Sequence, residues 1–228
     1  MTKRRELRSP AWRSGGMAFV AGLLLSAGLA VAGQPAAAAV GIFGYDETPK
    51  EGLDAFPKWT GVLERYFEEK AATSGNCQSK TFNRCHYDAW MGFLDSIRGE
   101  LTPRTLKAVN DYMNKSRYIV DPINWGITDY WATPGQFFDK YGDCEDYAIA
   151  KYLSLRALGW DPKTMRIVVV QDMNLRVPHA ILAVYLDGKA MLLDNQIAIL
   201  VDASKIRHYR PIFSLSEDSW WRHSPRKK

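Results

Sequence analysis

The sequence predicts an α+β fold, with helices in the first half of the chain and an antiparallel β-sheet in the second half. Apolar residues in the first half recur every three or four positions, which is the period of a helix that buries one face. The second half contains β-branched runs and the dipeptide Asp187-Gly188, which favours a two-residue hairpin turn. Helices that precede hairpin-linked strands are typical of the α+β class. The chain has no internal repeat or low-complexity linker after residue 40, so we expect one compact domain.

Local start and stop signals set the expected bounds of these elements. Thr102 and Pro103 are suited to the N-cap and the first position of a helix, and Asp143 is a good N-cap for a helix that ends at Gly159. Prolines and glycines interrupt residues 121–143, which we expect to be irregular. The predicted helices cover residues 57–72, 89–100, 103 onward and 143–158, and the predicted strands cover residues 165–171, 179–186 and 189–194.

Residues 1–39 have the order of a secretory signal peptide. A basic stretch leads into an apolar run from Met17 to Ala32, and small residues follow up to Ala39. A membrane anchor is the alternative, but the run is short and rich in Gly and Ala. We therefore expect a signal peptide at 1–39, a domain at 40–221 and a basic tail at 222–228. The expected location is the periplasm, without stable membrane insertion after cleavage.

The distribution of charge argues against a nucleic-acid partner. The formal net charge of the chain is +5. Five basic residues against one acidic residue lie within 1–39, so only +1 remains for the rest of the chain. A nearly neutral body gives no electrostatic basis for binding DNA or RNA.

The three cysteines fall into two groups. Cys77 and Cys85 lie in one polar segment and could close a small disulfide loop. Cys144 is then left over, as a reactive thiol, an intermolecular partner or an inert buried thiol. Its place at the start of the helix predicted at 143–158 favours a reactive thiol, because unpaired N–H groups and the helix dipole lower a thiol pKa.

The predicted hairpin brings a histidine and an acid together. If Leu186 and Lys189 flank the turn, Asp194 faces Ile181, which shares a face of the sheet with His179. Diagonal neighbours of this kind lie roughly 7–8 Å apart at the backbone, within reach of these side chains. An acid there can accept the imidazole N–H and leave the other ring nitrogen for a thiol. The three other histidines have no predicted acid or thiol partner and are expected at the surface: His86, His208 and His223.

Acidic residues are also expected around the thiol. Asp139, Asp143, Glu145 and Asp146 are close to Cys144 in sequence, and negative charge raises a thiol pKa. Capping explains one or two of these acids. A hard cation such as Ca²⁺, bound by carboxylate oxygens, would offset the others.

Four blocks of sequence resemble the bacterial transglutaminase-like cysteine proteinases, in particular the LapG-type periplasmic proteases, over about residues 41–221. The blocks are Asp129-Tyr130-Trp131-Ala132-Thr133-Pro134, Gly142-Asp143-Cys144-Glu145-Asp146-Tyr147-Ala148-Ile149-Ala150-Lys151-Tyr152, Leu155-Arg156-Ala157-Leu158-Gly159 and Leu193-Asp194-Asn195. The resemblance implies a papain/transglutaminase-like core with a catalytic triad of Cys144, His179 and Asp194. It also implies that Asp143 and Glu145 bind calcium.

The same resemblance implies a biological role. LapG-type proteases cut large surface adhesins near a di-alanine site, and an inner-membrane receptor for cyclic-di-GMP holds them inactive. Carried over, this predicts a calcium-dependent periplasmic endopeptidase in biofilm control, with a protein substrate and that receptor as partners. The alternatives are a transglutaminase-type acyl transferase and a non-catalytic periplasmic binding module with the same fold.

Overall fold

The computed structural model describes residues 41–72, 75–78, 82–99 and 101–226, so the predicted signal peptide lies outside the described residues. The α-helices are α1 (Pro57–Ala71), α2 (Arg84–Ser96), α3 (Pro103–Met113), α4 (Asp121–Asn124), α5 (Pro134–Lys140) and α6 (Cys144–Ala157). The strands are β1 (Asp46–Glu51), β2 (Met165–Asp172), β3 (Val177–Leu186), β4 (Lys189–Leu193), β5 (Val201–Asp202), β6 (Tyr209–Leu215) and β7 (Ser219–Ser224). Short 3₁₀ turns cover Ile42–Gly44, Pro162–Thr164 and Ala203–Lys205. Within the described ranges, no helix combines the length and apolarity needed to cross a bilayer.

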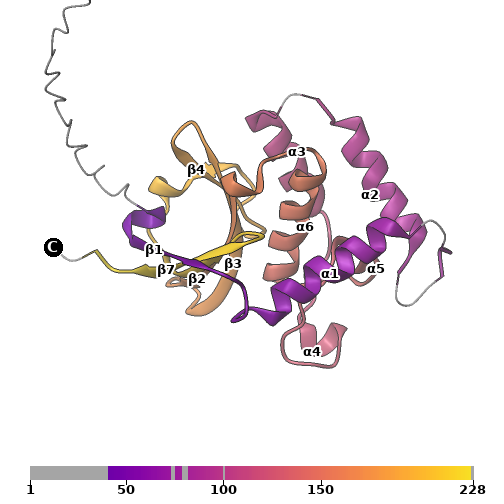
Figure 1. Cartoon of the computed structure of the whole chain (residues 1–228), viewed down its shortest axis with the longest axis horizontal. Coiled ribbons are helices and arrows are strands. Elements are labelled where there is room, and N and C mark those ends of the chain that lie inside the picture. Colours follow the sequence, from indigo (N-terminus) through magenta and orange to yellow (C-terminus); the bar gives the residue numbers. More distant parts are fainter. Residues whose placement is uncertain (1–40, 73–74, 79–81, 100, 227–228) are drawn as a thin grey trace, which may run out of the picture. The chain divides into compact units, whose positions relative to one another are not determined.

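The strands form one sheet in the order β1-β7-β6-β2-β3-β4-β5, and all neighbouring strands are antiparallel. The helices gather on one side of this sheet, with α6 next to β3 (Figure 1). The main hydrophobic core fills the space between α6, the other helices and the central strands. The α+β class is therefore confirmed.

The β3–β4 hairpin has the predicted register. Leu186 pairs with Lys189 and Leu182 pairs with Leu193. Asp187 and Gly188 have φ values of 49° and 74°, the left-handed conformation that a tight two-residue turn of this kind requires. Because the register is the predicted one, His179 and Asp194 approach each other at the end of the hairpin.

Several elements differ from the sequence-based expectation. Helix α2 begins at Arg84, because the Asn83 side chain caps it by accepting a hydrogen bond from the His86 N–H at 3.2 Å. The segment expected to be irregular contains the short helices α4 and α5, each with a proline in its first turn. Strands β1, β5, β6 and β7 were not predicted. Strand β7 includes Arg222–Ser224, so the expected tail at 222–228 begins too early.

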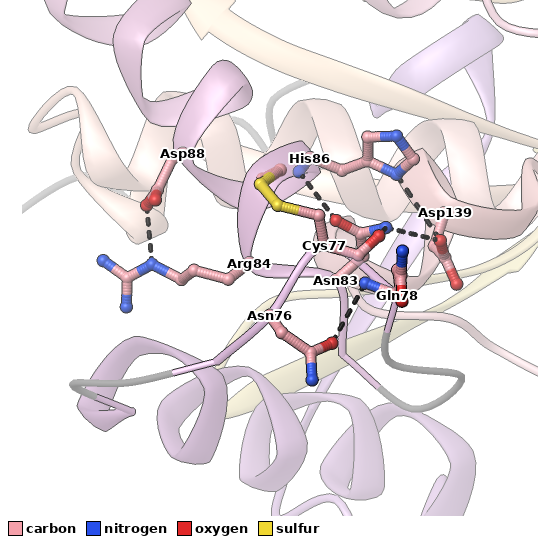
Figure 2. The surroundings of a disulfide bond; sticks show 9 residues. Asn76, Cys77, Gln78, Asn83, Arg84, His86, Asp88 and Asp139 are labelled. Atoms are coloured by element: carbon pink, nitrogen blue, oxygen red, sulfur yellow. Dashed lines mark hydrogen bonds and ion pairs between the residues drawn. A yellow bond between two sulfur atoms is a disulfide. The ribbon is translucent and has the colours of Figure 1, made fainter.

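A disulfide between Cys77 and Cys85 anchors the segment before α2, which confirms the pairing that the sequence left open. Figure 2 shows Asp139, on α5, beside the same region. Its carboxylate lies 3.3 Å from the Asn83 amide and 3.5 Å from the His86 ring. The chain turns sharply after α5, at Tyr141 with φ 66°. Asp139 therefore belongs to the α2–α5 contact, and its expected place around the thiol is wrong.

Two buried tryptophans help to position α6. The Trp90 ring donates to the Ser154 hydroxyl at 2.9 Å. The Trp59 ring donates to the Ser216 carbonyl at 2.7 Å and packs edge-on against Tyr152. Both tryptophans are fully buried, so their hydrogen bonds and their packing together hold α6 in position.

A buried acid links α1 to the start of α5. The Glu69 carboxylate accepts a hydrogen bond from the Thr133 hydroxyl at 2.5 Å. Gly135 leaves room for this acid, because a Cβ at this position would lie 2.8 Å from the Glu69 carboxylate and the carboxylate would have to shift. Burial is the main cause that raises the pKa of Glu69 to about 7, against an ordinary value of 4.5.

We predict that Glu69→Gln makes stability less dependent on pH. The folded protein holds the Glu69 proton more tightly than the unfolded chain, so this stabilisation is present below pH 4.5 and is lost as the pH rises through about 7. Glutamine can keep the Thr133 hydrogen bond without the charge. The free energy of unfolding is measured by urea denaturation at pH 5 and pH 8. Between these two pH values, the free energy of unfolding of the variant should fall by about 1–3 kcal/mol less than that of wild type. The exposed Glu68→Gln serves as the control, and equal pH slopes for Glu69→Gln and wild type would contradict the prediction.

Candidate active site

The candidate site is built around the first turn of α6. Asp143 is the N-cap and Cys144 is the first helical residue, as predicted. The Asp146 carboxylate turns back to accept the Asp143 N–H at 3.3 Å. A Cβ on Gly142 would lie 2.1 Å from this carboxylate, so only glycine permits the approach. The glycine before Asp143 and the acid three residues after it are thus parts of one capping arrangement.

Asp146 also fixes the neighbouring loop. It is fully buried, and its second oxygen accepts the backbone N–H of Ala132 at 2.7 Å. This contact ties the Asp129–Pro134 block to the start of α6. Two of the distinctive sequence blocks are therefore joined through one carboxylate.

The thiol of Cys144 is partly buried between an acid and the end of β3. It donates to the Glu145 carboxylate at 3.2 Å. The backbone N–H of Ala180, the residue after His179, donates toward the sulfur. Burial is the largest cause that raises the pKa of Cys144, and the charges of Glu145 and Asp143 add to it. The lowered thiol pKa expected from the helix terminus is therefore reversed by these surroundings.

His179 and Asp194 form a buried pair. Nε2 of His179 lies 2.9 Å from Oδ1 of Asp194, and both side chains are almost completely inaccessible. The other ring nitrogen, Nδ1, lies 3.3 Å from the Gln196 amide. The hydrogen bond to Asp194 holds the pKa of this acid below its ordinary value against the opposing effect of burial. The arrangement orients the imidazole and leaves Nδ1 free of the acid.

The sequence did not indicate three other groups that hold Asp194. The Tyr209 hydroxyl, from β6, donates to Oδ2 at 2.7 Å. The Gln196 N–H donates to Oδ1 at 2.8 Å, and the Asn114 amide donates to the Asp194 carbonyl at 2.8 Å. Tyr209 and Asn114 are distant in sequence and carry no local motif. The predicted hairpin register gives a signal for Gln196 alone, because pairing Leu186 with Lys189 sets Gln196 opposite His179.

Acidic side chains gather beside the thiol in a cluster that we call the acid cluster. Oxygens of Asp121, Asp143 and Asp146 lie within 4.8 Å of one another, as do oxygens of Asp121, Asp129 and Glu145. The sequence had indicated Asp143, Glu145 and Asp146, whereas Asp121 is the first residue of α4 and Asp129 lies between α4 and α5. Burial and mutual repulsion raise the pKa of Asp121 to about 6 and that of Glu145 to about 9, and raise the pKa of Asp146 well above its ordinary value.

The acid cluster has the chemistry of a cation site. One oxygen each of Asp121 and Asp143 is buried without a hydrogen-bond partner within the described residues. Buried carboxylate oxygens without donors are costly unless they are protonated or bound to a cation. Hard cations such as Ca²⁺ take oxygen ligands of this type. The residues present therefore fit calcium.

The remaining histidines are only partly as expected. The His86 side chain is about half exposed and contacts Asp139, and His208 is partly exposed. His223 is buried in β7 and lies 3.1 Å from the Ser214 hydroxyl, so its expected surface position is wrong. His223 was misassigned because strand β7, which buries it, was not predicted from the sequence.

The comparisons with known families and solved structures indicate the same family. Residues 74–222 match the family model described as bacterial transglutaminase-like cysteine proteinase, BTLCP. The structure of LapG from Legionella pneumophila aligns with a TM-score of 0.56 and 29% identity, over 71% of this chain and 87% of LapG. Calcium-bound L. pneumophila LapG aligns with a TM-score of 0.57 and 28% identity, over 71% of this chain and 87% of LapG. EGTA-treated L. pneumophila LapG aligns with a TM-score of 0.56 and 29% identity, over 71% of this chain and 84% of LapG. None of the curated proteins searched matches the chain.

The family match covers more than half of the chain, and the solved LapG structures share its fold. A thiol at the first position of a buried helix and a buried histidine–acid pair are in keeping with this assignment. The chain therefore belongs to the bacterial transglutaminase-like cysteine proteinases and is a cysteine protease of this type.

Proposed function

We propose that the protein is a periplasmic, calcium-dependent cysteine endopeptidase with Cys144 as nucleophile, His179 as general base and acid, and Asp194 as the group that orients His179. The observation that carries the proposal is the buried His179–Asp194 hydrogen bond, together with the Cys144 thiol at the N-terminus of α6. The Ala180 N–H that donates toward the sulfur belongs to the residue directly after His179, which supports the pairing of Cys144 with His179.

The proposed chemistry is acyl transfer. Nδ1 of His179 accepts the thiol proton while its Nε2–H remains hydrogen-bonded to Asp194. The sulfur then adds to the peptide carbonyl, and the developing oxyanion is stabilised by backbone N–H groups at the start of α6. The imidazolium gives its proton to the leaving amine as the C–N bond breaks. A water molecule, deprotonated by His179, then hydrolyses the thioester and regenerates the thiol.

The acid cluster is the proposed calcium site. Asp143 and Glu145 would hold the ion together with Asp121, Asp129 and Asp146, whose oxygens lie in the same cluster. Bound calcium would neutralise carboxylates beside the thiol and engage Glu145, which otherwise accepts a hydrogen bond from the thiol. The calcium-bound and EGTA-treated structures of LapG support this assignment.

A protein substrate is consistent with the surface beside the site. Tyr118 and Gly142 form an isolated β-bridge, so the 118–127 segment starts next to the nucleophile. Tyr118, Ile123 and Ile127 are at least half exposed. The likeness to LapG-type proteases favours a large surface adhesin as the substrate, with control by an inner-membrane cyclic-di-GMP receptor. The protein would then act in the release of cells from biofilms.

We predict that Cys144→Ala abolishes cleavage without unfolding the protein. The substitution removes the nucleophile, and activity should fall to below about one thousandth of wild type. Purified protein is incubated with an adhesin fragment that carries adjacent alanines, and the products are resolved by mass spectrometry. Circular dichroism and the thermal midpoint should match those of wild type.

The same assay separates hydrolysis from transamidation, because cross-linked products would replace two shorter fragments. Iodoacetamide provides a second measurement, since Cys77 and Cys85 are paired and Cys144 is the remaining thiol. Labelling at neutral pH should occur in wild type and disappear in Cys144→Ala. Cleavage that persists in Cys144→Ala would exclude Cys144 as nucleophile.

We predict that calcium removal inactivates the enzyme reversibly. EGTA should lower both cleavage and iodoacetamide labelling, and added Ca²⁺ should restore them, because the uncompensated acids disfavour the thiolate. Asp121→Asn keeps the shape of the side chain and should weaken calcium binding by about tenfold or more in titration calorimetry.

Asp139→Asn is the matched control for this experiment. It removes an acid that is closer to Cys144 in sequence than Asp121 is but lies outside the acid cluster, and it should leave calcium affinity unchanged. Full activity in EGTA would exclude the calcium requirement. Equal calcium affinities for Asp121→Asn and Asp139→Asn would exclude the acid cluster as the binding site.

A further inference from the structure

The side chain of Gln196 contacts the ring nitrogen of His179 that has to react. Nε2 of the Gln196 amide lies 3.3 Å from Nδ1 of His179. The other ring nitrogen, Nε2, lies 2.9 Å from Oδ1 of Asp194. Within the described residues, both nitrogens of the imidazole therefore have a hydrogen-bond partner, and neither of these two partners is the thiol.

The tautomer of the imidazole decides which group donates to Nδ1. The Asp194 carboxylate is an acceptor, so the ring carries its proton on Nε2. Nδ1 then has one lone pair and no proton, and the Gln196 amide N–H donates to it. The same lone pair takes the thiol proton in the proposed reaction. One lone pair does not serve both groups at once, so Gln196 competes with Cys144 for the base.

The backbone of Gln196 is held in place, whereas its side chain is accessible. The Gln196 N–H donates to Oδ1 of Asp194 at 2.8 Å, which fixes the residue at the end of the hairpin. Gln196 is exposed to solvent, while His179 is only 2% exposed. Exposed side chains change rotamer within nanoseconds. The amide is therefore able to turn away from Nδ1 without movement of the backbone or of the imidazole.

The thiol also has another partner in this structure, because Cys144 donates to the Glu145 carboxylate at 3.2 Å. The proton donor and the proton acceptor of the proposed reaction are thus both occupied. In our proposal calcium engages Glu145, but Gln196 is not part of the acid cluster. Calcium therefore frees the thiol and leaves the amide on Nδ1. A different group has to displace this amide before the proton moves.

We propose that Gln196 is a latch on His179: its amide occupies the base nitrogen in the resting enzyme and is displaced when a substrate peptide binds. This inference rests on the function proposed above. A primary amide has two donors and an acceptor, so the N–H and C=O groups of a peptide main chain replace the imidazole as its partners. Substrate binding then releases the lone pair of Nδ1. Without a peptide, the competition lowers the reactivity of the thiol toward other electrophiles.

The test is Gln196→Leu, which keeps nearly the size of the side chain and removes the amide. The hydrogen bond from the Gln196 backbone to Asp194 does not involve the side chain and remains. Iodoacetamide alkylates the thiol without a bound peptide. At neutral pH and saturating calcium, labelling of Cys144 should therefore be about two- to tenfold faster in the variant, the range of one neutral hydrogen bond.

The kinetic constants separate a latch from other roles of Gln196. With the adhesin fragment, KM of Gln196→Leu should fall by the same factor as the labelling rate rises, and kcat should stay unchanged, because the substrate displaces the latch at the expense of its own binding. A residue that contacts the transition state would instead show a lower kcat in the variant. Such a loss of kcat, or an unchanged labelling rate and KM, would overturn the proposal.

NMR gives a readout that does not depend on activity. In ¹⁵N-histidine-labelled protein, the Nδ1 resonance of His179 should shift in Gln196→Leu, because this nitrogen loses its donor. Gln78→Leu is the matched control, since Gln78 is an exposed amide in the loop closed by the Cys77–Cys85 disulfide (Figure 2). It should leave the labelling rate, KM and the resonance unchanged. A Nδ1 resonance that does not move in Gln196→Leu would exclude the contact.

A second variant keeps the inference testable if Gln196→Leu does not fold. Gln196→Ser keeps a polar side chain that is too short to reach Nδ1, and it should reproduce the faster labelling and the lower KM. If wild type cleaves the fragment and the folded variant has the labelling rate and KM of wild type, the latch is excluded and the proposed function stands. If wild type does not cleave the fragment and Cys144 does not react with iodoacetamide, the proposed function itself fails.

Discussion

The burial of α6 between the helices and the sheet determines the position of every group in the site. Residues 146–155 of this helix are all buried, so it has no solvated face to permit sliding or rotation. Its packing against β3 brings the Cys144 sulfur to the Ala180 N–H. The Trp90–Ser154 hydrogen bond and the Asp146–Ala132 hydrogen bond hold the two ends of the helix. A change in this packing would move the Cys144 sulfur away from the Ala180 N–H without altering either residue.

The same packing creates an electrostatic conflict at the start of the helix. The helix dipole favours acids in the first turn, worth about 0.3–1 kcal/mol each at exposed sites. Here the acids are buried together with Asp121, and their raised pKa values indicate that burial and repulsion outweigh the dipole. The thiol experiences the same field. This first turn is therefore poorly suited to form a thiolate until positive charge is added.

Sequence patterns predicted what depends on local geometry and missed what depends on distant contacts. The turn at Asp187-Gly188 sets the hairpin register, which is sufficient to place His179 beside Asp194. Tyr209 and Asp121 reach the site from elements far away in sequence, and no local period marks them. Asp139 shows the converse error, because the backbone reverses at Tyr141 and turns a sequence neighbour away from the thiol. Strand β1 is mostly exposed and polar, so it lacks the alternation that would predict an edge strand.

The two acidic parts of the proposed active site differ in how their charge is balanced. Asp194 is enclosed, and its carboxylate accepts hydrogen bonds from His179, the Gln196 N–H and the Tyr209 hydroxyl, all of which belong to the chain. The acid cluster has unpartnered oxygens and, in our proposal, takes its positive charge from a dissociable ion. Hydrogen-bond donors within the chain hold the histidine–acid pair, whereas a dissociable cation would make the state of the thiol depend on the calcium concentration. Calcium would then control the nucleophile alone, because the groups that orient His179 do not require the ion.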